Sequence, residues 1–142
     1  MDQRFPRIRD MERDAEHQRL QGVLQTHPEL ELVMLFGSLA RGTATVDSDL
    51  DIAVSAGTSL DVEARIRLID ELALAAGRPV DLVDLTRAGE PLLGQIMTTG
   101  VRLWGSDEAQ ARFLTRHLFD QADFLPYRDR ILAARRDAWI NG

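Results

Sequence analysis

Short, mostly apolar runs punctuate this chain and are separated by longer segments of mixed character. The runs are ELVMLF at 31–36, DLDIAV at 49–54, VDLVDL at 80–85 and VRLW at 101–104. Each run has the length of a β-strand, and a run that is apolar throughout is typical of a strand covered on both faces. We therefore expect these segments to form the strands of a sheet with other elements packed against it.

The first two segments between the runs differ in their patterns. Residues 10–26 carry apolar positions at helical spacing, which predicts a helix with Asp10 as its N-cap. His27-Pro28 should end this helix, because the residue before a proline avoids the helical conformation. The segment 38–46 is too short for a full helix, so a short helical turn and a loop are expected there.

Three further helices are expected. The sequence TSLD at 58–61 matches a capping box, which would open a helix that runs through Ala76 and has Gly77 as its C′ residue. A second helix is expected over about 88–99. A helical tail should start at Ser106 and break or kink at Pro126.

Helices and strands thus alternate along the whole chain. This alternation predicts an α/β fold in which helices pack on a small sheet, although the pattern leaves the strand directions open. A chain of 142 residues fits one compact domain, here 1–142, with a helical tail from about 106 to 142.

The amino-acid composition excludes several kinds of functional site. The chain has no cysteine, which excludes disulfides and thiolate zinc sites, and no lysine, which excludes a Walker-type phosphate lysine. A net charge of −6 argues against binding a long nucleic acid. No long apolar segment is present and the start of the chain is polar, so we expect a cytoplasmic protein without membrane contact.

Acidic residues occupy alternate positions in and before the second predicted strand. Because side chains two apart on a strand share a face, Asp49 and Asp51 would lie side by side while Leu50 and Ile52 face the core. Two like charges this close favour a cation between them, and hard oxygen ligands suit Mg²⁺ or Mn²⁺. Asp47 precedes the strand and is expected to serve the turn.

A third carboxylate should come from the next strand. Asp81 is the better candidate, because Asp84 lies three residues on, faces the other way and is expected to be structural. Three carboxylates from two strands can hold a pair of divalent ions, as in two-metal phosphoryl-transfer sites.

A glycine-serine pair follows the first predicted strand. Gly37 lets a phosphate approach the backbone, and Ser38 is expected to cap the short helix, whose free N–H groups would bind phosphate. Arg41, one turn further on, can add a charge-assisted contact to phosphate oxygens or can be a solvated surface residue.

These features together resemble a known family. Gly37-Ser38, ten residues and Asp49-Leu50-Asp51 resemble the G-S-x10-D-x-D signature of the DNA polymerase β-like nucleotidyltransferase superfamily. The longer segment GSLARGTATVDSDLDI resembles the minimal nucleotidyltransferases, the antitoxins of HEPN–MNT toxin–antitoxin modules. The resemblance covers most of the chain and implies the polymerase β-like fold with a small mixed sheet.

The resemblance also implies roles for individual residues. Gly37 and Ser38 would hold the triphosphate, Asp49 and Asp51 would bind both metal ions, and Asp81 would be the third acid. The implied reaction moves AMP from ATP onto a hydroxyl, with a tyrosine of a partner HEPN toxin as acceptor. A hetero-oligomer with that toxin is therefore expected.

Two other functions remain open at this point. The chain could be an antitoxin that acts by binding alone, through tail residues such as Leu114, Leu118 and Phe124, or it could modify a small molecule or an RNA end. The R-x4-H pattern of HEPN ribonucleases recurs as Arg112 and His117, but the residues after Gly105 are too few to build a helical bundle. His17 and His27 are expected at the surface.

Overall fold

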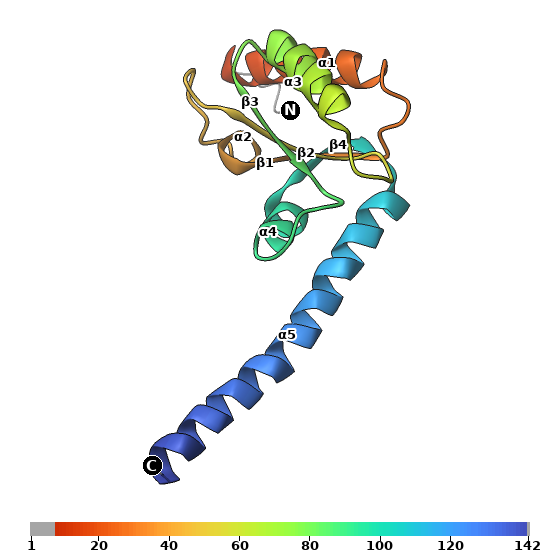
Figure 1. The fold of residues 1–142 in the computed structure, drawn as a ribbon. Helices are drawn as coiled ribbons and strands as arrows, with labels where there is room; N and C mark the ends of the chain where they lie inside the picture. Colours follow the sequence, from red (N-terminus) through yellow and green to blue (C-terminus); the bar gives the residue numbers. More distant parts are fainter. Residues whose placement is uncertain (1–7, 142) are drawn as a thin grey trace, which may run out of the picture.

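The computed structural model describes residues 8–141 and shows helices on both faces of one sheet (Figure 1). Its elements are α1 (Ile8–Leu24), β1 (Leu32–Phe36), α2 (Gly37–Arg41), β2 (Leu50–Ser55), α3 (Val62–Ala76), β3 (Val80–Asp84), α4 (Leu92–Thr99), β4 (Val101–Gly105) and α5 (Asp107–Asn141). This order is the predicted one. The bounds of β1, β3 and β4 differ from the prediction by one residue at one end, and those of β2 by one residue at each end.

The sheet is mixed and has the strand order β3-β2-β1-β4. β1 lies in the middle, antiparallel to β2 and to β4, whereas β2 and β3 are parallel. Parallel neighbours need a long crossover, which α3 supplies. The expected small mixed sheet with helices packed on it is confirmed.

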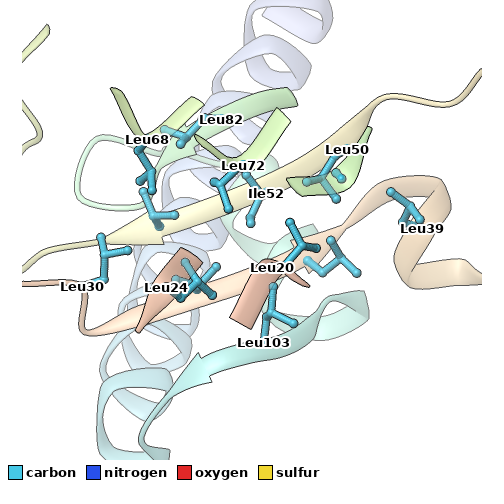
Figure 2. Packing of buried hydrophobic residues seen from close by; sticks show 14 residues of the cluster. Leu20, Leu24, Leu30, Leu39, Leu50, Ile52, Leu68, Leu72, Leu82 and Leu103 are labelled. Carbon is cyan, nitrogen blue, oxygen red and sulfur yellow. The ribbon is translucent and has the colours of Figure 1, made fainter. Parts of the chain in front are cut away.

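Side chains that alternate along the strands feed two hydrophobic clusters, one on each face. Leu50 and Ile52 of β2 join the larger cluster, where they meet Leu20 of α1 and Leu72 of α3 (Figure 2). Ala53 of β2 points to the other cluster, which also takes side chains from α4 and from the start of α5. Coverage of both faces explains why the strands read as apolar runs rather than as alternating ones.

The helix starts show where local signals misled the prediction. Asp61, and not Thr58, is the N-cap of α3, and its carboxylate accepts the N–H of Ala64 at 2.7 Å. The helix thus begins one turn later than the capping box implied. Asp10 lies within α1 and does not cap it. Gly77 closes α3 in the left-handed conformation, as predicted.

The long helix α5 leaves the body of the protein and projects beyond it (Figure 1). Ser106 caps it, because its hydroxyl accepts the N–H of Ala109. α5 continues through Pro126, so the predicted break is wrong: a proline removes one backbone hydrogen bond, and a helix of 35 residues can lose one without ending. Among residues 8–141, none of the helices is both long and apolar enough to cross a lipid bilayer.

Candidate functional site

The candidate site residues gather at one end of the sheet. β1 ends there and α2 follows it directly, while the antiparallel β2 and its parallel neighbour β3 both begin there. Asp51 is the register partner of Phe36, the residue before Gly37, and it is also the register partner of Asp81. The topology therefore brings together residues from three separate segments of the chain.

Of the two aspartates of the D-x-D segment, Asp51 lies on β2 as the alternation predicts, whereas Asp49 directly precedes the strand. Leu50 and Ile52 are fully buried in the larger hydrophobic cluster, whereas Asp51 is half-buried and Asp49 is exposed. Because neighbours on a strand point to opposite faces, Asp51 shares its face with Ala53. The carboxylate of Asp51 therefore lies on the sheet face that α4 and α5 cover further along.

Asp51 is the electrostatic centre of this group. Burial raises the pKa of its carboxyl group, the charges of Asp81 and Asp49 raise it further, and Arg41 opposes them. All three partners are thus close enough for their charges to act on Asp51. Three carboxylates that repel one another at the edge of a sheet form an arrangement that a bound cation would relieve.

Gly37 lies directly beneath the carboxylate of Asp51. Its φ is +72°, a conformation that side chains disfavour, and a Cβ placed there would lie 2.2 Å from Oδ2 of Asp51. Only glycine satisfies both constraints at this position. This close approach brings the end of β1 next to the start of β2.

The short helix α2 differs in one detail from the prediction. Phe36 occupies the N-cap position, and no side chain caps the helix, so Ser38 lies in the first turn and does not cap it. The N–H groups of Gly37 and Ser38 therefore belong to the first turn, where backbone donors lack partners within the helix. Such donors can bind phosphate oxygens.

The segment after α2 returns the chain to β2. Gly42 ends α2 with φ +74°, which lets the chain turn back. Asp47 is exposed in a turn, and the hydroxyl of Ser48 accepts the N–H of Thr45 at 2.8 Å. These residues shape the loop, as expected, and Arg41 is exposed at the end of α2.

The donor set fits a hard divalent cation, although the carboxylates do not form a closed cage. In the part of the chain that the structure describes, no group of three His, Cys, Asp or Glu side chains is already close enough to enclose a metal ion. The carboxylates on adjacent strands, the raised pKa of Asp51 and the absence of any sulfur ligand all favour Mg²⁺ or Mn²⁺.

Asp84 is structural, as expected. It is 6% exposed, and its carboxylate accepts the N–H groups of Leu60 and Thr86, each at 3.0 Å. It thereby holds the loop before α3 and the end of β3, and it takes no part in the carboxylate group.

The R-x4-H residues of α5 have separate structural partners. Arg112 pairs with Glu31 at 3.1 Å, while His117 is buried and its Nδ1 lies 2.6 Å from Glu90. His27 was expected at the surface, but it is largely buried and contacts Glu29 and Glu71. The side chain of Phe124 lies outside the described part of the structure.

One residue that contacts the loop beside the site was not predicted from the sequence. Arg78, between α3 and β3, donates from Nη1 to the carbonyl oxygens of Thr45 and Ser48, each at 3.0 Å. Thr45 and Ser48 lie 33 and 30 positions before Arg78, and no pattern in the sequence indicates that these residues are in contact.

A comparison with protein families gives a match over the segment that holds the site. The model for the family described as "Polymerase beta, Nucleotidyltransferase" matches residues 18–109. The matched range includes α2, β2 and β3 and therefore every candidate site residue.

Individual relatives are also similar to this chain. The protein adenylyltransferase MntA of Shewanella oneidensis is 44% identical over 89 residues, which are 63% of this chain and 64% of that protein. A chain in the crystal structure of a toxin–antitoxin with AMP-PNP matches with a TM-score of 0.71 and 35% identity, over 84% of this chain and 98% of that one.

A further structural relative contains a modified partner. This is a tri-AMPylated Shewanella oneidensis HEPN toxin in complex with an MNT antitoxin, which matches with a TM-score of 0.68 and 31% identity. The match covers 87% of this chain and 98% of the other.

Proposed function

The chain belongs to the polymerase beta nucleotidyltransferase family, and on this premise we propose that it is an antitoxin that transfers AMP from ATP to a HEPN-type toxin. The solved structures that match it also confirm the expected fold of that family. The similar adenylyltransferase from Shewanella oneidensis and the complex with an AMPylated HEPN toxin support both the reaction and the acceptor.

ATP is proposed as the donor because a similar structure was solved with the ATP analogue AMP-PNP. Gly37 and Ser38 are proposed to hold the triphosphate through the backbone N–H groups of the first turn of α2. Arg41 adds a positive charge at the other end of that helix. Because ATP is the donor, we place the reaction in the cytoplasm.

Asp49, Asp51 and Asp81 are proposed as ligands for divalent ions, with Mg²⁺ as the expected metal and two ions as the expected number. Bound Mg²⁺ would supply positive charge to the α-phosphate and align it for attack. The raised pKa of Asp51 marks the place where such a charge is most favourable.

The chemistry is a displacement at the α-phosphorus. The hydroxyl oxygen of a toxin tyrosine forms the new bond, and the bond to the bridging oxygen of the departing pyrophosphate breaks. The hydroxyl proton passes to a carboxylate, and the exposed Asp81 is the candidate base. The chain's own residues thus contribute positioning and electrostatic stabilisation.

A protein acceptor fits the small size of this chain. A partner that brings its own hydroxyl to an exposed site needs no enclosed acceptor pocket. Leu118 and Phe119 are 55% and 66% exposed on α5 and offer an apolar contact for the toxin. A hetero-oligomer with the toxin follows from this arrangement.

The observation that carries the proposal is the juxtaposition of Gly37, Asp51 and Asp81. A Cβ at Gly37 would collide with the carboxylate of Asp51, and Asp81 is the direct register partner of Asp51. Phosphate-binding backbone and paired carboxylates therefore meet at one point, which is the minimum that metal-assisted nucleotidyl transfer requires.

The alternative is an antitoxin that acts by occlusion, and the exposed apolar residues of α5 suit that function as well. The two functions differ in stoichiometry. An enzyme present at one part in fifty should inactivate all of the toxin when ATP and Mg²⁺ are present, and should fail without ATP. Neutralisation that needs equimolar chain and ignores ATP would favour occlusion and contradict the transferase proposal.

A further inference from the structure

We propose that Arg78, which is paired with Glu16, is a positioning residue that fixes the loop between the phosphate-binding turn and the metal-binding aspartates. The linker loop, residues 42–49, joins α2 to β2 and carries Asp49 at its end. This inference rests on the proposed function, because it concerns the alignment of the two halves of that site.

The linker loop has few contacts of its own. Thr43 N–H donates to the carbonyl of Ser38 at 3.0 Å, and Ser48 N–H donates to the carbonyl of Thr45 at 3.1 Å. Two contacts of Ser48 with Thr45 close the small turn on itself, Thr43 and Gly42 bond back to α2, and Ala44 packs against the larger hydrophobic cluster. These local bonds shape the turn but do not fix it against the rest of the protein.

Arg78 supplies that connection. One guanidinium nitrogen of Arg78 donates to the carbonyls of Thr45 and Ser48, which lie at the two ends of the turn. The neighbouring Pro79 accepts the N–H of Leu50 at 2.8 Å through its carbonyl oxygen. The α3–β3 connection thus holds the chain immediately on both sides of Asp49.

Glu16 of α1 fixes the guanidinium itself. The Nε atom of Arg78 lies 3.0 Å from Oε1 of Glu16, and the two side chains are only 15% and 9% exposed. Neither atom makes a hydrogen bond, so the two charges attract each other without an aligned N–H···O contact, and the pair keeps the guanidinium beside α1.

A buried ion pair is weak evidence for added stability, because desolvation of the charges offsets their attraction. The orientation of the loop is a better account of this pair. Asp49 and Asp51 are two positions apart, and displacement of the loop would move Asp49 relative to the phosphate-binding turn. Misplacement of about 1 Å at a reacting centre can cost on the order of a hundredfold in rate.

A control residue is present in α1, the helix that contains Glu16. Arg19 of α1 donates to the backbone carbonyl of Ala75 in α3 at 2.8 Å, away from the linker loop. Arg78→Met and Arg19→Met therefore both remove a guanidinium that donates to backbone carbonyls, but only Arg78→Met affects the linker loop. Glu16→Gln removes the paired charge and leaves Arg78 in place.

The first measurement is the rate of tryptic cleavage after Arg41, at the start of the linker loop. We expect Arg78→Met to speed this cleavage at least fivefold and Glu16→Gln to speed it less, with Arg19→Met unchanged. The second measurement is AMP transfer to the toxin. In Arg78→Met kcat should fall on the order of tenfold to a hundredfold, with the KM for the toxin unchanged.

The inference is overturned if Arg78→Met is cleaved no faster than Arg19→Met, or if it transfers AMP at the wild-type rate. If Arg78→Met does not fold, Glu16→Gln decides by the same two readouts. A wild-type chain that transfers no AMP would count against the proposed function alone. Binding of AMP-PNP with Mn²⁺ then replaces transfer, and an unchanged affinity in Arg78→Met would overturn the positioning role.

Discussion

Asp51 and Asp81 are direct register partners on two parallel strands, although thirty positions of sequence separate them. The crossover through α3 creates this relationship, because it returns the chain to the same end of the sheet. Gly37 arrives at that end from the antiparallel β1. A four-stranded sheet thus suffices to bring together the turn proposed to bind phosphate and a pair of acids.

Two glycines with similar backbone angles offer a test of the approach between Gly37 and Asp51. Gly42→Ala meets nothing within 4 Å and should lose only about 1 kcal/mol of unfolding free energy for its positive φ. Gly37→Ala adds a collision with the Asp51 carboxylate and should lose about 2 kcal/mol or more. It should also abolish AMP-PNP binding, which Gly42→Ala retains. Equal losses of stability and of binding in the two variants would contradict this geometry.

The charge of Asp51 should oppose folding when no divalent cation is present. Burial and the charges of Asp81 and Asp49 raise the pKa of Asp51 above its ordinary value of 3.8. The folded state therefore prefers the protonated form, and that preference is lost as the pH rises through the folded pKa. At pH 7 in EDTA, Asp51→Asn should raise the unfolding free energy by up to about 1 kcal/mol, because water screens a half-buried charge.

Added Mg²⁺ should make the wild-type protein more stable than Asp51→Asn. Binding of the ion to the folded wild-type protein stabilises it by mass action, whereas Asp51→Asn should gain little. Chemical denaturation with and without Mg²⁺ measures both effects. A variant that is less stable than the wild type in EDTA would show that Asp51 is held by contacts other than a cation.

The contact between the α1–β1 loop and α3 should depend on pH through His27, which pairs with Glu71. Although burial opposes its charged form, hydrogen bonds to Glu71 and Glu29 raise the pKa of His27 above the usual 6.5. Its contribution to stability is therefore complete below pH 6.5 and is lost as the pH rises through the folded pKa. His27→Gln should cost roughly 1 kcal/mol at pH 6 and clearly less at pH 9. Denaturation curves at the two pH values check this, and a cost that does not change with pH would contradict it.

The exposed apolar residues of α5 should contribute to toxin binding. Leu118→Asp combined with Phe119→Asp should weaken the complex by about 2 kcal/mol or more, since buried apolar anchors dominate interfaces. Leu74→Asp on α3 is the matched control, because Leu74 is 87% exposed and belongs to another face. Calorimetric titration of the toxin distinguishes the two, and equal affinities would remove α5 from the interface.

The strands and their acids could be predicted because local pattern and tertiary structure agree there. The apolar Leu50 and Ile52 were expected in the core and lie there, and the alternation along the strand places Asp51 on the opposite face. The helix starts were less predictable, because Thr58 and Asp61 both satisfy the local capping rule, and that rule alone does not choose Asp61, the N-cap of α3.

Contacts between distant segments could not be predicted. The parallel pairing of β2 with β3, which joins Asp51 to Asp81, depends on strand directions that the apolar runs do not reveal. Arg78 is an ordinary residue of a turn in the sequence, and its role depends on where the linker loop returns. At Pro126 the local rule predicted a break that does not occur, because a long helix tolerates the loss of one backbone hydrogen bond.

The most direct test of the central claim is the intact mass of the toxin after incubation with this chain, ATP and Mg²⁺. We expect the toxin to gain one or more AMP units on a tyrosine, with release of pyrophosphate. Asp49→Ala and Asp51→Ala should leave the toxin unmodified while still binding it. A toxin that is neutralised by the wild-type chain and yet keeps its unmodified mass would contradict the account.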